Sequence, residues 1–577
     1  MKSTYEKFPQ IVADGEKYCG WSSIIREISS KIETDRNRPF VVAIESYQGV
    51  HHDELTKAFK QIPHSLFIDT SDVFMLESEI RSITYPDVTD DAIFGYMTRL
   101  TMSDLLDSNK VKQYQEKILQ ITGTVVVYGN GASLVATNAD ILIYADMARW
   151  EIQLRMKKHQ ISNLGIYNND DTYQEQYKRG FFVDWRICDK LKKSIFDKID
   201  FWLDTNKANE PKMIGAKTFS RCLDNAVSQP FRVVPYFDPG PWGGQWMKEK
   251  FALDETQSNF AWCFDCVPEE NSLLFNFDGV VFEMPAINVV FFRTRELLGS
   301  PVEARFGQEF PIRFDFLDTI EGGNLSLQVH PNNQYIREEF GMAYTQDESY
   351  YMLDAKQEAK VYLGLKEGID SEQMLEELRM AQEGNQPFDT DKFINSFPAH
   401  KHDHFLIPAG TVHCSGKNGL VLEISATPYI FTFKLWDWAR LGLDGKPRPI
   451  NVERGSHVID WGRDTNYVRA QLINRVEQVA QGDGWREERT GLHENEFIET
   501  RRHWFTKAVP HTTGNSVNVL NLVEGDAVVV ESPDNKFSPY IVHYAETFII
   551  PASIGEYIIR PMNDNKECAT IKAYVRL

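Results

Sequence analysis

The sequence lacks the features of several classes of protein. No run of 18 apolar residues occurs, and the first ten residues, MKSTYEKFPQ, contain no apolar signal core, so we expect neither a membrane span nor a membrane partner. Basic residues are the minority charge, since 62 Lys and Arg face 83 Asp and Glu, a formal net charge of -21. Because nucleic-acid phosphates bind basic surfaces, we also expect no nucleic-acid partner.

Cysteine is scarce, at seven residues in 577. An odd number scattered over a long chain is typical of reduced thiols, and we therefore expect a cytoplasmic protein without a disulfide framework. Cys263 and Cys266 form a CxxC pair with no second pair beside it. We interpret them as buried thiols and not as a zinc or redox site.

Apolar runs alternate with helical patterns in the first part of the chain. The segments PFVVAIE, TGTVVVYGNG and ADILIYADM have the composition of buried strands, and helical patterns follow the first and the third. Unbroken apolar strands that alternate with helices are typical of a parallel sheet covered on both faces. We therefore predict an α/β domain over residues 1–225.

The pattern changes after the Pro- and Gly-rich segment PFRVVPYFDPGPWGG. Short strand patterns such as NLSLQVHP, KVYLGL and LVLEISA then predict an all-β barrel or sandwich. One helical insert, at about 370–395, has Asp370 as its expected N-cap. The segment FIIPASIGEY near 548 echoes FLIPAGTVH near 405 but lacks its His, which indicates a duplication. We predict a metal-binding domain over 226–500 and a metal-free one over 501–577.

Four polar residues stand out in the strand patterns of the 226–500 domain. Gln328 and His330 are two residues apart in one strand, so both side chains lie on one face. His413 follows the tight turn IPAGTV, and Glu348 begins the strand-like DESYYML. Each residue alone is ordinary as a buried or solvated side chain. Together, two imidazoles, a carboxylate and an amide suit one Zn²⁺ per chain, although other divalent metals also fit.

The motifs LSLQVHP, DESYYMLDA, LIPAGTVH, LVLEIS and WDWAR occur in the order found in class I mannose-6-phosphate isomerases, and residues 230–577 resemble that family. The resemblance implies a double cupin barrel that interconverts mannose 6-phosphate and fructose 6-phosphate, so the partner is a small-molecule sugar or sugar phosphate. It implies zinc ligation by Gln328, His330, Glu348 and His413. It also implies substrate contact by Ser326 and catalytic roles for Glu423, as proton-transfer base, and Lys434, as oxyanion stabiliser.

The chain departs from that family at its basic positions. Asp315 and Gln346 stand where the family usually has Lys, and Lys434 stands where it has Arg. Phosphate recognition relies on such cations. Arg313, two residues before Asp315 and on the same strand face, can restore one charge, and we predict that it binds substrate. Two alternatives stay open: an isomerase of a different, unphosphorylated sugar, and a non-catalytic metal-cupin sugar sensor.

Residues 1–225 resemble P-loop kinases of the uridine kinase type. The strand VVAIE and the following SYQGVHH occupy the place of the phosphate-binding loop. Of the pattern G-x-x-x-x-G-K-[ST], only Gly49 remains, and Val50 takes the place of the lysine. Without that lysine and the glycines the loop cannot cradle phosphates. We therefore predict a degenerate, catalytically silent P-loop-like domain.

Overall fold

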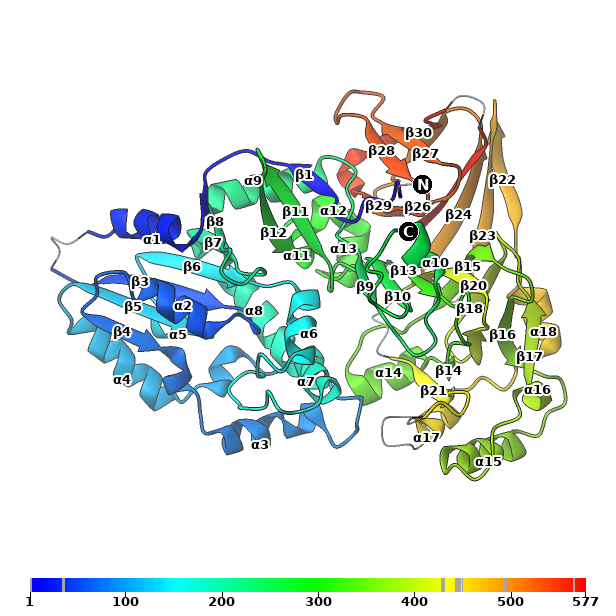
Figure 1. Ribbon diagram of the computed structural model, residues 1–577, viewed down its shortest axis with the longest axis horizontal. Coiled ribbons are helices and arrows are strands. Elements are labelled where there is room, and N and C mark those ends of the chain that lie inside the picture. The colour runs from blue at the N-terminus through cyan, green and yellow to red at the C-terminus, as the bar shows by residue number, and fades with distance from the viewer. Residues whose placement is uncertain are drawn as a thin grey trace. The chain divides into compact units, whose positions relative to one another are not determined.

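The computed structural model describes residues 3–33, 37–426, 431–441, 448, 450–491, 493, 496–563 and 566–577. The chain is multidomain and forms two compact units, an α/β unit and a larger β unit (Figure 1). Both are assembled from separate stretches of chain. The α/β unit comprises Gln10–Asn225 and Ser272–Phe291, and the β unit comprises Met1–Pro9, Ala226–Asn271 and Phe292–Leu577.

A seven-stranded sheet forms the centre of the α/β unit, in the order β2-β8-β7-β6-β3-β5-β4. The strands β3 to β7 are parallel, which confirms the predicted parallel sheet, and β3, β5 and β6 are buried along their whole length. The strands are β2 (Lys17–Cys19), β3 (Phe40–Ser46), β4 (Leu66–Asp69), β5 (Thr124–Gly129), β6 (Ile141–Asp146), β7 (Phe201–Asp204) and β8 (Lys212–Gly215). The helices are α1 (Trp21–Ser30), α2 (His52–Phe59), α3 (Glu77–Val88), α4 (Ser108–Leu119), α5 (Ala132–Val135), α6 (Arg149–Lys157), α7 (Tyr173–Arg179), α8 (Trp185–Ile195) and α9 (Ala216–Val227).

A later segment of the chain completes the α/β unit. The hairpin β11 (Ser272–Phe277) and β12 (Val280–Pro285) pairs in parallel with β1 (Gln10–Val12). After it, α11 (Ile287–Phe292) brings Asn288 to the carboxylate of Asp146, to which its amide donates at 2.8 Å. The predicted boundaries at residues 225 and 226 therefore do not separate two self-contained stretches.

Two antiparallel sheets, here the first sheet pair, make up one half of the β unit. Their orders are β18-β15-β20-β13-β10-β9 and β17-β16-β19-β14-β21. The strands are β9 (Tyr236–Asp238), β10 (Trp262–Cys266), β13 (Arg313–Asp318), β14 (Leu327–Val329), β15 (Glu348–Ala355), β16 (Lys360–Leu365), β17 (Ile394–Pro398), β18 (His404–Ile407), β19 (His413–Ser415), β20 (Gly419–Ser425) and β21 (Phe433–Trp436).

Short helices accompany this sheet pair. The predicted insert contains α15 (Ser371–Gln382) and α16 (Thr390–Phe393), and the Asp370 carboxylate accepts from two backbone N–H groups of α15, which confirms the N-cap. The other α-helices of the β unit are α10 (Trp246–Lys250), α12 (Thr294–Leu298), α13 (Ser300–Phe306), α14 (Asn333–Phe340), α17 (Val452–Ser456) and α18 (Thr465–Gln471).

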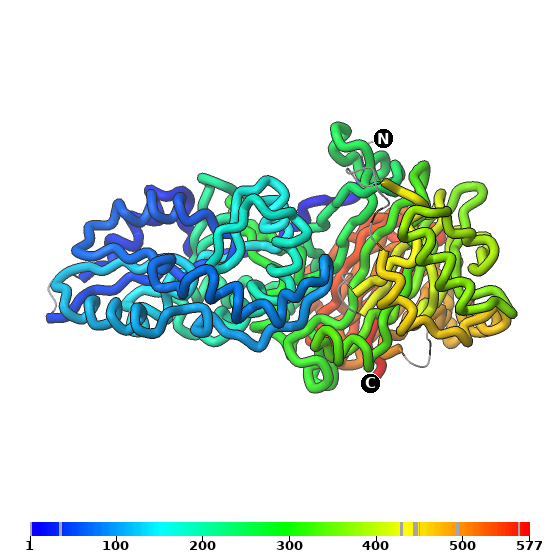
Figure 2. The backbone as a smooth tube through the Cα atoms, turned by 90° about the horizontal axis from the view of Figure 1, so that it is seen from below, coloured from blue at the N-terminus to red at the C-terminus, as the bar shows by residue number. Residues whose placement is uncertain are grey.

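A second sheet pair begins at Glu477, earlier than the predicted boundary at residue 501. Its sheets, β22-β23-β24-β31-β26-β29 and β25-β30-β27-β28, enclose an apolar core between them. In Figure 2 its red strands run beside the green and yellow strands of the first sheet pair. The strands are β22 (Glu477–Gly482), β23 (Trp485–Gly491), β24 (Ile498–Phe505), β25 (Val509–Thr512), β26 (Asn518–Glu524), β27 (Ala527–Glu531), β28 (Tyr540–His543), β29 (Thr547–Ile550), β30 (Glu556–Pro561) and β31 (Cys568–Val575).

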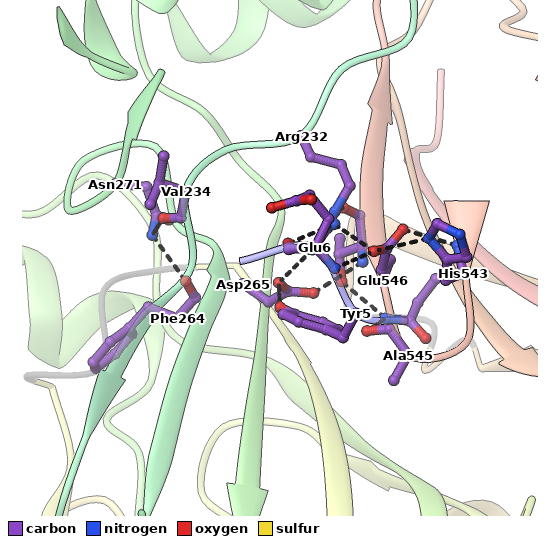
Figure 3. Close-up of polar contacts among 12 residues, drawn as sticks. Tyr5, Glu6, Arg232, Val234, Phe264, Asp265, Asn271, His543, Ala545 and Glu546 are labelled. Carbon is purple, nitrogen blue, oxygen red and sulfur yellow. Dashed lines mark hydrogen bonds and ion pairs between the residues drawn. The ribbon is translucent and has the colours of Figure 1, made fainter. Parts of the chain in front are cut away.

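The start of the chain is anchored inside the β unit (Figure 3). Arg232 donates to the backbone carbonyl of Glu6 at 2.9 Å, and its guanidinium pairs with Glu546 at 2.8 Å. Glu546 in turn accepts from the backbone N–H of Glu6. All seven cysteines are unpaired, and Cys263 and Cys266 are buried on β10 as predicted. No helix among the described residues has the length and apolarity to cross a bilayer.

Candidate metal centre

Three strands bring the predicted metal ligands together between the sheets of the first pair. Gln328 on β14 is directly opposite His413 on β19, and Glu348 reaches them from β15 in the facing sheet. The Glu348 oxygens lie 2.9 Å from His413 Nε2 and 3.1 Å from His330 Nε2. The Gln328 amide lies 3.3 Å from His413 Nε2, and a half-turn of that amide presents its oxygen instead.

Backbone carbonyls orient both imidazole rings. His330 Nδ1 lies 3.1 Å from the carbonyl oxygen of Phe431, and His413 Nδ1 lies 2.8 Å from that of Thr411. A carbonyl only accepts, so each Nδ1 carries a proton, and each Nε2 faces a carboxylate oxygen of Glu348. Histidines that bind metals are held in this way, because the second hydrogen bond fixes both the tautomer and the ring orientation.

The centre contains buried polar atoms without hydrogen-bond partners. His330, Glu348 and His413 are at most 1% exposed, yet His330 Nε2 and Glu348 Oε1 make no hydrogen bond. Such atoms are costly to bury, and a divalent cation would satisfy them. Among the described residues, this is the one group of three His, Cys, Asp or Glu side chains whose ligand atoms all lie within 4.8 Å of one another. These residues therefore fit a bound metal ion.

Glu423 shares the inner face of the sheet with Glu348. The amide of Gln346 joins the two, donating to Glu348 at 2.8 Å and to Glu423 at 3.4 Å. Burial, with Asp315 and Glu348 nearby, raises the pKa of Glu423 well above its usual range. Although burial opposes ionisation, the two imidazoles hold the pKa of Glu348 well below its usual range, as an anionic ligand requires. The Glu348 carboxyl is thus suited to bind a cation, and the Glu423 carboxyl is suited to hold a proton.

A basic cluster lies beside Gln328 on the neighbouring strand. Lys434 on β21 is directly opposite Gln328, so both side chains share a face. Burial lowers the pKa of Lys434, and Arg448 and Arg440 lower it further. Both arginines pair with Asp437, at 3.0 and 2.5 Å. Three cations therefore surround a single carboxylate.

The predicted substrate residue Ser326 also reaches this cluster, because its hydroxyl donates to Asp437 at 3.1 Å. Sequence reasoning missed Arg440 and Arg448. The available signal was their position directly after the FKLWD strand, in the segment WDWARLGLDGKPR.

The Arg313 side chain is bound by other groups of the protein. It is 3% exposed, and its guanidinium donates to the carbonyl of Ala426 and to the carboxylate of Glu269. The sequence pattern put it on the correct face of β13. Glu269 lies in the loop after β10. To bind a substrate phosphate, Arg313 would have to give up this ion pair.

Side chains of the α/β unit pack against the loop that follows β3. Gly49 has φ 96°, and a Cβ at that position would lie 2.9 Å from the side chain of Ile152. Its carbonyl accepts from Arg155 at 2.9 Å, and Val50 is buried. A cavity of about 620 Å³ lies at this edge of the sheet, and its charged lining residues are Asp53, Asp72, Glu77 and Lys110. Carboxylates outnumber cations there, which disfavours a polyphosphate.

Comparison with known proteins gives different results for the two parts of the chain. Residues 20–228 match a family model described as "Domain of unknown function (DUF8485)". The chain is 28% identical to the mannose-6-phosphate isomerase of Streptococcus mutans over 234 residues, 40% of this chain and 68% of that protein. It is 25% identical to mannose-6-phosphate isomerase ManA of Bacillus subtilis over 236 residues, 41% and 69% of the two chains.

A crystal structure of the Bacillus subtilis mannose 6-phosphate isomerase aligns with 60% of this chain and 99% of that one, at 17% identity and a TM-score of 0.49. The curated relatives confirm the similarity to mannose-6-phosphate isomerases that the motifs predict. The resemblance of the first 225 residues to P-loop kinases stays a prediction.

Proposed function

We propose that this chain is a zinc-dependent aldose–ketose isomerase that interconverts mannose 6-phosphate and fructose 6-phosphate in a cupin-type site. The observation that carries the proposal is the buried set of Gln328, His330, Glu348 and His413, in which the ligand atoms of the two imidazoles and the carboxylate converge within 4.8 Å. Relatives at 25–28% identity that are mannose-6-phosphate isomerases support the reaction class.

The four side chains would hold Zn²⁺, which as a Lewis acid polarises the sugar carbonyl and the neighbouring hydroxyl when bound. Glu423 carries the proton between C1 and C2, and its raised pKa suits a group that must both accept and return a proton. Lys434 stabilises the negative charge that develops on the sugar oxygen, because its ammonium shares a face with Gln328.

The phosphate group binds at the basic cluster. Arg440 and Arg448 share the single carboxylate of Asp437, so positive charge is left over for an anion. The Ser326 hydroxyl lies at the same place, where it donates to Asp437. We assign Arg313 to the ion pair with Glu269 and not to the substrate.

The α/β unit is a degenerate P-loop-like domain without kinase activity. Support comes from Val50 in the lysine position, from the side chain of Ile152 that packs against Gly49, and from the acidic lining of the neighbouring cavity. Its role is therefore separate from phosphoryl transfer.

A coupled assay that detects fructose 6-phosphate tests the proposal. We expect turnover of mannose 6-phosphate and much slower turnover of mannose. The opposite preference would favour an isomerase of an unphosphorylated sugar, which the acidic Asp315 and the neutral Gln346 also support. No turnover of any aldose, with metal bound, would favour a sugar sensor.

A further inference from the structure

Two carboxyl groups face each other across neighbouring strands inside the first sheet pair. Asp315 on β13 is directly opposite Glu423 on β20, and Glu423 is directly opposite Tyr350 on β15. Directly opposed residues of antiparallel strands share a face, with Cβ atoms about 5 Å apart. Glu348, two residues before Tyr350, lies on the same face and contacts the imidazoles of the facing sheet. The Asp315–Glu423 pair therefore lines the interior next to the metal ligands.

Several polar groups at and beside the Asp315–Glu423 pair, here called the carboxyl wall, have no hydrogen-bond partner among the described residues. Asp315 is 6% exposed and makes no hydrogen bond or ion pair to another described residue. The Gln346 carbonyl oxygen and the Tyr350 hydroxyl are buried and also lack partners. Buried polar groups are normally satisfied, so groups of this kind at a candidate site are available to hydrogen-bond a ligand.

The carboxyl wall also has no neighbouring cation that is free to bind an anion among the described residues. The nearest cation along β13, Arg313, is held by Ala426 and Glu269. The cations Lys434, Arg440 and Arg448 belong to the other sheet and its following loop. Two carboxyls without a neighbouring free cation offer a phosphate no positive charge, whereas sugar hydroxyls form hydrogen bonds with them.

We infer that Asp315 is a specificity-determining residue that accepts a hydrogen bond from a hydroxyl of the sugar chain. The phosphate end of the substrate then points away from Asp315, toward Arg440 and Arg448. This inference rests on the proposed isomerase function. It also explains how a chain with Asp in place of the family's Lys at this position still takes a sugar, because the carboxylate recognises hydroxyls where a lysine would recognise an anion.

The inference is tested by a thermodynamic cycle in which one change is made in the protein and the other in the substrate. Mannose 6-phosphate is compared with its 3-deoxy and 4-deoxy analogues, which keep the reacting C1 and C2, in the wild type and in Asp315→Ala. For one analogue we expect the wild type to lose about ten- to a hundredfold in kcat/KM. Asp315→Ala should lose a similar factor on the parent sugar and nothing further on that analogue. Equal losses in both proteins for both analogues would overturn the inference.

Three controls separate this result from a general failure. Asp315→Asn keeps the shape and an acceptor oxygen, and should recover part of the lost activity. Glu321→Ala removes an exposed carboxylate after β13 and should behave as wild type. Zinc content must stay unchanged in Asp315→Ala, since metal loss would make Asp315 a support of the metal ligands instead.

A binding measurement keeps the inference testable if the chain turns over no sugar. Calorimetry with mannitol 1-phosphate, the reduced form of mannose 6-phosphate, needs no isomerisation. Binding weakened about tenfold by Asp315→Ala would uphold the role of Asp315 while the isomerase proposal failed. Unchanged affinity would overturn the role of Asp315 whatever the activity.

Discussion

The hydroxyl of Tyr5 donates a 2.5 Å hydrogen bond to Asp265, 260 residues later in the chain (Figure 3). The Tyr5 ring stacks on Phe251 at 3.9 Å, and the Arg232 guanidinium lies over it at 4.8 Å. The first residues of the chain are therefore part of the β unit, although the α/β segment follows them directly.

Replacing Tyr5 should destabilise the β unit. Tyr5→Ala removes a buried ring and a hydrogen bond, and we expect a loss of about 3–5 kcal/mol in the free energy of unfolding. Tyr5→Phe should cost only about 1 kcal/mol. Denaturant unfolding measures this loss. Phe8→Ala is the matched control, because that ring is 61% exposed; equal effects at positions 5 and 8 would contradict the anchoring role.

Replacing residues of the basic cluster should change the kinetic constants, whereas replacing Arg313 should change the stability. Arg448→Ala removes one of the two proposed phosphate ligands, so KM for mannose 6-phosphate should rise about ten- to a hundredfold. Lys434→Ala should lower kcat, because its contact strengthens in the transition state. Arg313→Ala leaves the half-buried Glu269 without its partner, so it should lower stability and leave KM nearly unchanged. Steady-state kinetics with thermal denaturation decides, and a large KM effect confined to Arg313→Ala would reverse the assignment.

The buried Lys572 should make stability depend on pH. Burial lowers its pKa to about 8, below the unfolded value of about 10.4. Below pH 8 the lysine is charged in both states, and burying that charge costs up to about 3 kcal/mol; the cost fades as the pH rises toward 10.4. Lys572→Met should therefore stabilise the protein most at pH 7 and progressively less above pH 8. Denaturation at several pH values checks this, with the exposed Lys536→Met as control. A gain that grew above pH 8 would refute it.

The α/β unit should not bind magnesium ATP. Val50 lacks the ammonium of the phosphate-binding lysine, and the backbone at Gly49 packs against Ile152. Isothermal calorimetry should show no binding for the wild type. Val50→Lys should not restore it, because the added charge does not open the packed loop. Micromolar affinity in the wild type would contradict this account and indicate a second enzymatic function.

The gathering of His330, Glu348 and His413 was predictable because its signals are local. Period-two spacing places Gln328 and His330 on one face, and the turn before His413 aims that side chain at the same site. The helix N-cap at Asp370 was predictable for the same reason.

Other features depend on contacts with no local signal. The hairpin of β11 and β12 looks like any other strand pair in sequence, and periodicity does not state which sheet a strand joins. The Tyr5–Asp265 bond and the pairing of Arg313 with Glu269 likewise join positions far apart in sequence. These contacts also set the unit boundaries and the role of Arg313.

The central claim is that the buried histidines and Glu348 hold a zinc ion on which isomerisation depends. The most direct measurement is the zinc content of the purified protein together with its conversion of mannose 6-phosphate to fructose 6-phosphate. We predict one zinc per chain, loss of activity after chelation, recovery when zinc is restored, and no bound zinc in His413→Ala. The exposed His457→Ala should keep its zinc. Full activity in the metal-free protein, or stoichiometric zinc in His413→Ala, would contradict the account.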